Sequence, residues 1–222
     1  MKHSSTLLMA EFVTHDVKRF ILSRPRNFDF VPGQGVKIVV DEPKWRKEDD
    51  HPFTPTSLRD DRVLELIIKR YPDRGGVTNK LHSLEAGAKL LVSEPFGTIT
   101  YKGPGVFIAA GAGVTPFIAI ARQLAPEGKL DENSLICSNK TPADMICEKE
   151  LRHYFGSRCI LTCTREVAAG YANRRINAEF LKDIIRDFKR RFYICGPDPF
   201  VGQIKAILKE LGASPDALVF EE

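Results

Sequence analysis

Hydrophobic and polar residues change their pattern near the middle of the chain. Before residue 102, short apolar runs are separated by turns containing Pro, Gly and Asp, without helices between them. These runs lie at 12–14, 18–22, 36–40, 64–69 and 90–93. Strands at this spacing predict an antiparallel β-barrel or sandwich.

After residue 102, apolar strands alternate with amphipathic helices. The strands are expected at 106–110, 134–138, 159–164, 191–195 and 218–221, and the helices at 116–123, 142–154, 178–188 and 199–211. Such alternation predicts a parallel five-stranded sheet covered on both faces. We therefore predict two domains, an antiparallel β-barrel over 1–102 and an α/β domain over 103–222.

The strongest local signal is VFIAAGAGVTPF at 106–117. A buried strand runs directly into Gly111 and Gly113, which allow a tight turn and the close approach of a ligand. Thr115 is expected to cap a helix and Pro116 to fill its first position. A helix N-terminus after a glycine turn suits a pyrophosphate, although Pro116 stands where the full dinucleotide fingerprint has a third glycine.

A second candidate phosphate site follows the strand at 64–69. Gly75 and Gly76 precede Val77 and Thr78, and Thr78 is expected to cap a short helix over 79–84. An ordinary capped helix after a turn is the alternative interpretation of the same residues.

Composition excludes several classes of protein. The chain has 222 residues, of which 43% are hydrophobic and 28% charged, and its net charge of +4 comes from scattered basic residues. We expect no nucleic-acid partner, and no membrane span or signal peptide. The odd number of cysteines, five, without a C-x-x-C pair, predicts no disulfide framework, no metal and no iron–sulfur cluster in this chain, and a cytoplasmic location.

Five separated motifs resemble those of the ferredoxin–NADP reductase superfamily. They are Pro32-Gly33-Gln34, His51-Pro52-Phe53-Thr54, Gly75-Gly76-Val77-Thr78, Gly111-Ala112-Gly113-Val114-Thr115-Pro116 and Cys195-Gly196-Pro197. The resemblance covers nearly the whole chain. It implies an FAD-binding barrel followed by an NAD(P)-binding α/β domain.

The resemblance also implies roles for residues of the barrel. Phe53 would lie against the isoalloxazine ring, with a plain core aromatic as its alternative role. Thr54 would hydrogen-bond flavin N5, the atom that accepts hydride. Thr78 and neighbouring backbone N–H groups would hold the FAD pyrophosphate, while Lys69 would neutralise phosphate or face water.

In the second domain, Gly111, Gly113 and Thr115 would hold the pyrophosphate of NAD(P)H. Cys195 and Gly196, at the end of a parallel strand, would lie beside the nicotinamide. The alternative role of Cys195 is that of a small buried apolar residue.

The complete set of expected site residues follows from these roles. The expected catalytic residues are Thr54, Cys195 and Glu221. The expected cofactor-binding residues are His51, Pro52, Phe53, Thr54, Ile68, Lys69, Gly75, Gly76, Val77, Thr78, Gly111, Gly113, Val114, Thr115, Pro116, Lys140, Cys195, Gly196 and Pro197.

Three departures from the family pattern change the expectation. His51 replaces an arginine of the flavin motif, and histidine is only partly charged near neutral pH, so FAD would be held less tightly. Phe53 replaces a tyrosine but keeps its stacking face. Glu221 matches an acidic residue of the last strand, but no aromatic residue follows it to shield the flavin.

The expected reaction is hydride transfer from NADPH or NADH to FAD, followed by electron transfer to flavodoxin or ferredoxin. NADPH is favoured because Lys140 stands where an acidic residue would hold the ribose of NADH, and Arg165, Arg174 and Arg175 lie further along. The alternatives are a free-flavin or ferric reductase, an electron-transfer subunit similar to the dihydroorotate dehydrogenase partner, and a non-catalytic nucleotide-binding module.

Overall fold

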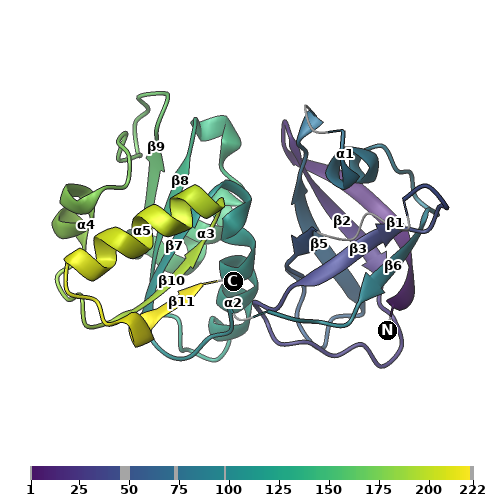
Figure 1. Cartoon of the computed structure of the whole chain (residues 1–222), viewed down its shortest axis with the longest axis horizontal. Helices are drawn as coiled ribbons and strands as arrows, with labels where there is room; N and C mark the ends of the chain where they lie inside the picture. Colours follow the sequence, from purple (N-terminus) through teal and green to yellow (C-terminus); the bar gives the residue numbers. More distant parts are fainter. Residues whose placement is uncertain (1, 46–50, 73–74, 98, 221–222) are drawn as a thin grey trace. The chain divides into compact units, whose positions relative to one another are not determined.

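The computed structural model describes residues 2–45, 51–72, 75–97 and 99–220. The chain forms two compact units, Met1–Thr100 and Tyr101–Glu222 (Figure 1). The division lies two residues before the boundary predicted from the sequence.

The first unit is an antiparallel sheet with the strand order β4-β3-β6-β1-β2-β5. Its elements are β1 (Lys2–Thr14), β2 (Val17–Ser23), β3 (Val36–Val40), β4 (Pro52–Phe53), β5 (Val63–Lys69), α1 (Val77–His82) and β6 (Lys89–Ser93). The two edges of the sheet approach each other, because Pro55 forms an isolated bridge with Leu66 and the Thr56 N–H donates to the Glu65 carbonyl at 2.8 Å. The sheet thus closes almost completely, which confirms the predicted barrel.

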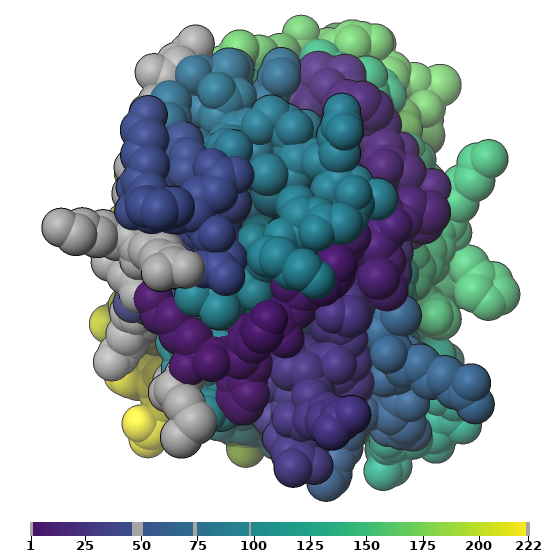
Figure 2. Space-filling model, turned by 90° about the vertical axis from the view of Figure 1, so that its right-hand side faces the viewer, coloured from purple at the N-terminus to yellow at the C-terminus, as the bar shows by residue number. Residues whose placement is uncertain are grey.

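Strand β1 begins ten residues earlier than the sequence pattern predicts. Its first half pairs with β6 and its second half with β2, so one strand serves two neighbours. Ser5 is buried there, and its hydroxyl donates to the Ser23 carbonyl at 2.6 Å. The polar start of the chain hid this strand, because a paired serine satisfies a buried position without apolar character. The N-terminal segment, purple in Figure 2, crosses the face of the unit shown there.

The barrel core combines alternating inward residues of the strands with two residues of α1 and with Phe28 and Phe30 from the connection between β2 and β3. Phe20, Leu22, Leu64, Val36 and Leu81 are each at most 1% exposed. Helix α1 has only six residues, and it packs against the barrel core through its apolar side.

The second unit is a parallel sheet with the order β11-β10-β7-β8-β9, which confirms the predicted five strands. Its elements are β7 (Gly105–Ala110), α2 (Thr115–Leu124), β8 (Ser134–Asn139), α3 (Glu148–Phe155), β9 (Cys159–Cys163), α4 (Ala178–Ile184), β10 (Arg191–Cys195), α5 (Asp198–Glu210) and β11 (Leu218–Phe220). Phe107 on β7 contacts Phe117 of α2 and Phe155 of α3. The opposite face packs against Phe180 of α4 and Ile204 of α5, so helices cover both faces.

One predicted helix is interrupted. Residues 142–154 were expected to be continuous, but the segment Pro142–Asp144 forms a separate 3-10 turn before α3. The carboxylate of Asp144 accepts from both the N–H and the hydroxyl of Thr141, at 2.9 and 2.7 Å, which closes a capping box. Cys147 then adopts a left-handed conformation (φ 52°), so the helix cannot begin before Glu148.

The segment that enters the second unit is fixed by a buried tyrosine. Tyr193 lies on β10 and is 0% exposed. Its hydroxyl donates to the Gly103 carbonyl at 2.7 Å and accepts from the Lys102 N–H at 2.9 Å. One side chain thereby satisfies two backbone groups outside the sheet. Within the described residues, no helix has the length and hydrophobicity needed to cross a lipid bilayer.

We expect Tyr193→Phe to lower the free energy of unfolding by about 1–2 kcal/mol, because the ring keeps its packing while two backbone groups lose their partner. Chemical denaturation followed by circular dichroism measures this change. The matched control is Tyr154→Phe on α3, where the ring lies against His153 and is only half-buried. Equal effects of the two substitutions would contradict a specific contribution from the Tyr193 hydroxyl.

Candidate cofactor-binding sites

The flavin-motif segment closes the barrel. Phe53 pairs with Val36 at one edge of the sheet, and Pro55 bridges to Leu66 at the other edge. Thr54 lies between these two pairings and is half-buried. Its position is therefore fixed from both sides by backbone pairing, which suits a residue that has to aim a hydroxyl.

The side chains of this segment differ in exposure. His51 and Pro52 are exposed, whereas Phe53 is half-buried and packs against the barrel core. Residues directly opposite in an antiparallel pair face the same side, so Phe53 shares the core side with Val36. Phe53 is therefore part of the barrel core, and a flavin ring would contact the part of its ring that remains exposed.

The glycine segment after β5 differs locally from the prediction. Gly76, and not Thr78, occupies the N-cap of α1, and Thr78 is already within the helix and only 6% exposed. The N–H groups of Asn79 and Lys80 both donate to the Gly76 carbonyl, at 3.0 and 3.2 Å. The N–H groups of Gly76, Val77 and Thr78 precede this ladder, and helix geometry offers them no acceptor within the helix.

Gly75 explains the glycine requirement of the same segment. Its φ is +58°, a conformation that L residues rarely adopt, and a Cβ there would meet nothing within 4 Å. The backbone is thus open on the side of the glycines. This donor set, three successive N–H groups beside an uncovered glycine, fits the oxygens of a pyrophosphate.

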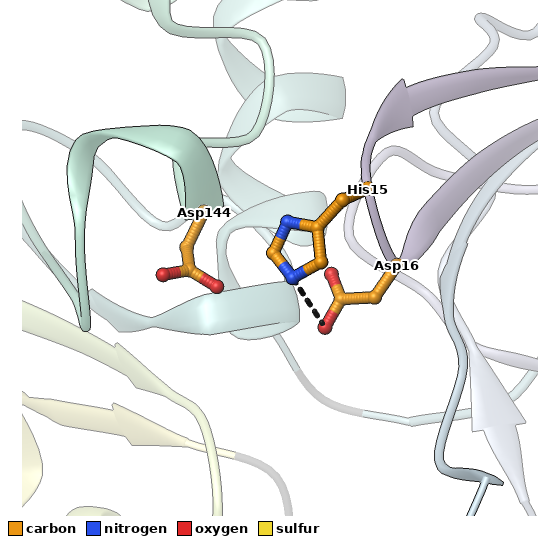
Figure 3. A group of neighbouring side chains, drawn as sticks. All are labelled: His15, Asp16 and Asp144. Carbon is orange, nitrogen blue, oxygen red and sulfur yellow. Dashed lines mark ion pairs between the residues drawn. The ribbon is translucent and has the colours of Figure 1, made fainter.

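Two expected cofactor residues serve the barrel itself. The Ile68 side chain is 2% exposed and belongs to the core. The Lys69 ammonium lies 2.7 Å from a carboxylate oxygen of Asp16. Burial raises the pKa of Asp16, but the hydrogen bond and charge of Lys69 outweigh it and leave the pKa below the usual value. Figure 3 shows Asp16 with His15, whose Nε2 lies 3.7 Å from it; Asp144, also drawn there, belongs to the second unit.

In the second unit, two loops meet where the strand order reverses. From β7 the chain winds through β8 to β9, and it then returns to β10 on the other side of β7. The carboxyl ends of β7 and β10 are therefore neighbours at the switch point of the sheet, the usual ligand position in open α/β sheets. The segments that follow are Gly111–Val114, a 3-10 turn leading into α2, and Cys195-Gly196.

Gly113 holds these two loops together. A Cβ at Gly113 would lie under 3.0 Å from the carbonyl of Cys195 and from the nitrogen of Gly196. The approach of protein backbone is thus sufficient to require a glycine at this position. The approach of a ligand, which the sequence suggested, stays a prediction. Gly111 has the opposite character: its φ is +54° and the nearest atom to a Cβ would be 4.0 Å away, on Asn139. Gly111 leaves open the space above the sheet edge.

The residues after Gly113 are structural. Thr115 is the first residue of α2 and not its N-cap, and its hydroxyl donates to the Ala112 carbonyl at 2.9 Å. Val114, Thr115 and Pro116 are all buried. In a 3-10 turn that begins at Gly111, the N–H groups of Gly111 and Ala112 have no acceptor within the turn. These are the backbone groups left to bind a ligand here. This donor set fits a second pyrophosphate.

The Cys195 loop leads directly into α5. Cys195 is half-buried, and Gly196 has φ 156° with Phe200 close to where its Cβ would lie. Pro197 is exposed, and its carbonyl accepts the N–H of Phe200 at 2.8 Å. The Cys195 carbonyl thus faces Gly113 while its side chain stays partly accessible.

Lys140 is exposed just after β8, and the N–H of Arg165 donates to its carbonyl at 2.9 Å. The backbones of these two cationic residues are therefore adjacent at the sheet edge. Arg174 is engaged elsewhere, because it forms an ion pair with Asp183 and its guanidinium lies 4.9 Å from the ring centroid of Phe180. Expected catalytic residue Glu221 lies outside the described residues.

Sequence reasoning missed two features of these sites. One is the closure of the barrel through Pro55 and Thr56. The only indication of it in the sequence was Pro55, because a proline within a strand is found mainly at the edge of a sheet. The other is His82, a buried histidine at the end of α1. The sequence could have indicated this buried position, because His82 lies on the apolar side of a short amphipathic segment.

Comparisons with known proteins agree with this geometry. Residues 4–101 match the family model of the oxidoreductase FAD-binding domain, and residues 107–206 match that of the oxidoreductase NAD-binding domain. Among solved structures, the FAD/NAD-binding domain of nitric oxide dioxygenase from Vibrio cholerae is similar with a TM-score of 0.87 at 21% identity, covering 99% of this chain and 97% of that one. A ferredoxin NADP+ reductase from Neisseria gonorrhoeae gives 0.82 at 21% identity, covering 99% and 98%.

Curated relatives extend the likeness to sequence. The chain is 26% identical to the ferredoxin–NAD(P)+ reductase component of a naphthalene 1,2-dioxygenase system from Pseudomonas putida, covering 95% of this chain and 66% of the relative. It is 30% identical to the glycine betaine monooxygenase reductase subunit of Chromohalobacter salexigens, covering 90% and 58%. The chain therefore spans about three fifths of the length of these relatives. It belongs to the ferredoxin–NADP reductase superfamily, with an FAD-binding and an NAD-binding domain.

We expect Gly113→Ala to destabilise the second unit by about 2 kcal/mol or more, because the added methyl would overlap the backbone of Cys195. The matched control is Gly202→Ala within α5, where a Cβ would meet nothing within 4 Å. That substitution should raise stability by about 0.5–1 kcal/mol. Thermal unfolding of both variants measures the contrast, and a Gly113→Ala protein as stable as the wild type would contradict the packing described.

Proposed function

We propose that the chain is an NAD(P)H-dependent flavoprotein reductase that passes electrons through FAD to a ferredoxin or flavodoxin. The main observation that supports this proposal is that each domain presents a separate set of backbone N–H donors, one after Gly75 and one after Ala110. Two pyrophosphates need two such sets. The name of one relative, the ferredoxin–NAD(P)+ reductase component of a naphthalene 1,2-dioxygenase system, supports a ferredoxin as the acceptor.

The chemistry that FAD supplies when bound is acceptance of a hydride at N5 and release of electrons one at a time. The chain contributes binding and orientation. Gly76, Val77 and Thr78 would hold the FAD pyrophosphate through their N–H groups, and the Thr54 hydroxyl would hydrogen-bond the flavin. Cys195 and Gly196 would hold the nicotinamide at the switch point of the second sheet.

This function needs no acid–base residue of the protein, since hydride transfer between the two cofactors depends on position and exclusion of water. Thr54 and Cys195 are suited to positioning, because backbone pairing fixes the first and the contact with Gly113 fixes the second.

A free-flavin or ferric reductase is the second candidate. The observation in its favour is His51, which is exposed and replaces the arginine of the family's flavin motif. An imidazole cannot make the bidentate contact of a guanidinium with a phosphate, so flavin exchange would be faster. A nucleotide-binding module without turnover is distinguished by FAD that NAD(P)H does not reduce.

The first experiment is the visible spectrum of the purified protein with anaerobic addition of NADPH or NADH. We expect a bound flavin that is bleached by the nicotinamide and reoxidised faster by ferredoxin or flavodoxin than by free flavin. Bleaching with free FMN or ferric iron as the better acceptor favours the second candidate. A flavin that stays oxidised contradicts a reductase of either kind.

Lys140 supplies a test of nicotinamide preference. Its charge beside Arg165 favours the 2′-phosphate of NADPH, and we expect Lys140→Ala to lower kcat/KM for NADPH roughly tenfold while leaving NADH nearly unchanged. The control is Lys129→Ala, an exposed lysine of the same domain that pairs with Glu127. Equal loss with both nucleotides would show that Lys140 does not contact the 2′-phosphate.

A further inference from the structure

His82 ties the end of α1 to the barrel. It is the last residue of the helix and is 8% exposed. Its Nε2 lies 2.8 Å from the Ile68 carbonyl, and its ring meets the Phe20 ring edge-on at 5.5 Å between centroids. The Lys18 ammonium donates to the His82 carbonyl at 2.9 Å. One residue therefore connects the helix to both β5 and β2.

The hydrogen bond from His82 to Ile68 closes a particular loop. The segment between them starts with Lys69 at the end of β5 and contains the Gly75–Thr78 donor set. A helix of six residues is not stable alone, so tertiary contacts set its orientation. Those contacts come from the buried side chains of Val77 and Leu81 and from the bond made by His82.

The surroundings of His82 favour a neutral imidazole. Burial lowers its pKa from the usual value of 6.5; the bond to Ile68 acts in the opposite direction, while the charges of Lys18 and Arg70 lower the pKa further. Asp16 is the nearby anion that raises it, but its carboxylate is already paired with Lys69. A proton added to the imidazole thus adds a positive charge beside those of Lys18 and Arg70.

The sign of the pH effect follows from this depressed pKa. Stability contributed by the neutral form is fully present above about pH 6.5, and it is lost as the pH falls from there toward the lower pKa of the folded state.

We propose that His82 is a positioning residue for FAD: its hydrogen bond to Ile68 and its packing on Phe20 hold α1 and the Gly75–Thr78 segment in place, and a proton added to this buried ring, beside Lys18 and Arg70, weakens FAD binding. This inference rests on the proposed function, since it assigns a control to the same FAD site. It concerns affinity for FAD, not the transfer of hydride.

The test compares wild type, His82→Gln, His82→Leu and the control His153→Gln, whose parent histidine is exposed on α3. Glutamine places an amide N–H near the position of Nε2 and does not titrate. The FAD dissociation constant is measured by ultrafiltration at about pH 8 and about pH 5.5, on either side of the usual histidine range. The melting temperature without FAD is recorded at both values.

We expect wild type and His153→Gln to bind FAD about tenfold more weakly at the lower pH, and His82→Gln to lose most of this difference. His82→Leu should bind about tenfold more weakly at both values. If the leucine variant does not fold, the glutamine variant alone decides.

Two results would overturn the inference while leaving the reductase intact. One is a parallel loss of FAD in wild type and His82→Gln. The other is a change of melting temperature in the His82 variants with unchanged FAD affinity, which would mark a merely structural residue. A wild-type protein that binds no FAD at either pH would overturn the FAD site and the inference together.

Discussion

The close approach of Gly113 to the carbonyl of Cys195 is the constraint on which the second domain depends. Two loops from adjacent parallel strands can pass this near only if one of them lacks a side chain. The contact fixes where the turn after β7 begins and where β10 ends. The N–H groups of Gly111 and Ala112 are thereby directed to the edge of the sheet at which its strand order reverses.

In the first domain, the position of the proposed site depends on the closure of the barrel. Its sheet has two edges, and the segment from β4 to Thr56 joins them by pairing with β3 and then with β5. Closure removes exposed edges, and it also fixes Thr54 between the two pairings. Structural and functional requirements therefore fall on the same few residues. This explains why Phe53 can serve the barrel core and still present part of its ring to a ligand.

Much of this organisation could be predicted from the sequence, because it follows from periodicity. The alternation of strands and helices after residue 102 predicted the parallel sheet, which is confirmed. The glycine turn at Gly111 predicted a pyrophosphate site at the edge of that sheet, which stays a prediction. The predictions failed where a single hydrogen bond decides local structure. Thr78 and Thr115 look like helix caps in the sequence, yet each lies within its helix, with Gly76 and Val114 at the N-cap positions. Cap geometry depends on backbone angles that neighbouring loops impose, and sequence carries little of that information.

The proposed pyrophosphate donors belong to the backbone and not to side chains. This explains why the fold can be shared when few residues are identical. The groups proposed to hold both pyrophosphates are N–H groups, which any residue with the required backbone angles supplies. Identity can therefore fall to 21% while the fold remains similar, at a TM-score of 0.87. The proposed nicotinamide preference and flavin retention rest instead on two side chains, Lys140 and His51, both exposed. Substitution at such exposed positions costs little stability, so these are positions at which members of one fold can differ without loss of the fold.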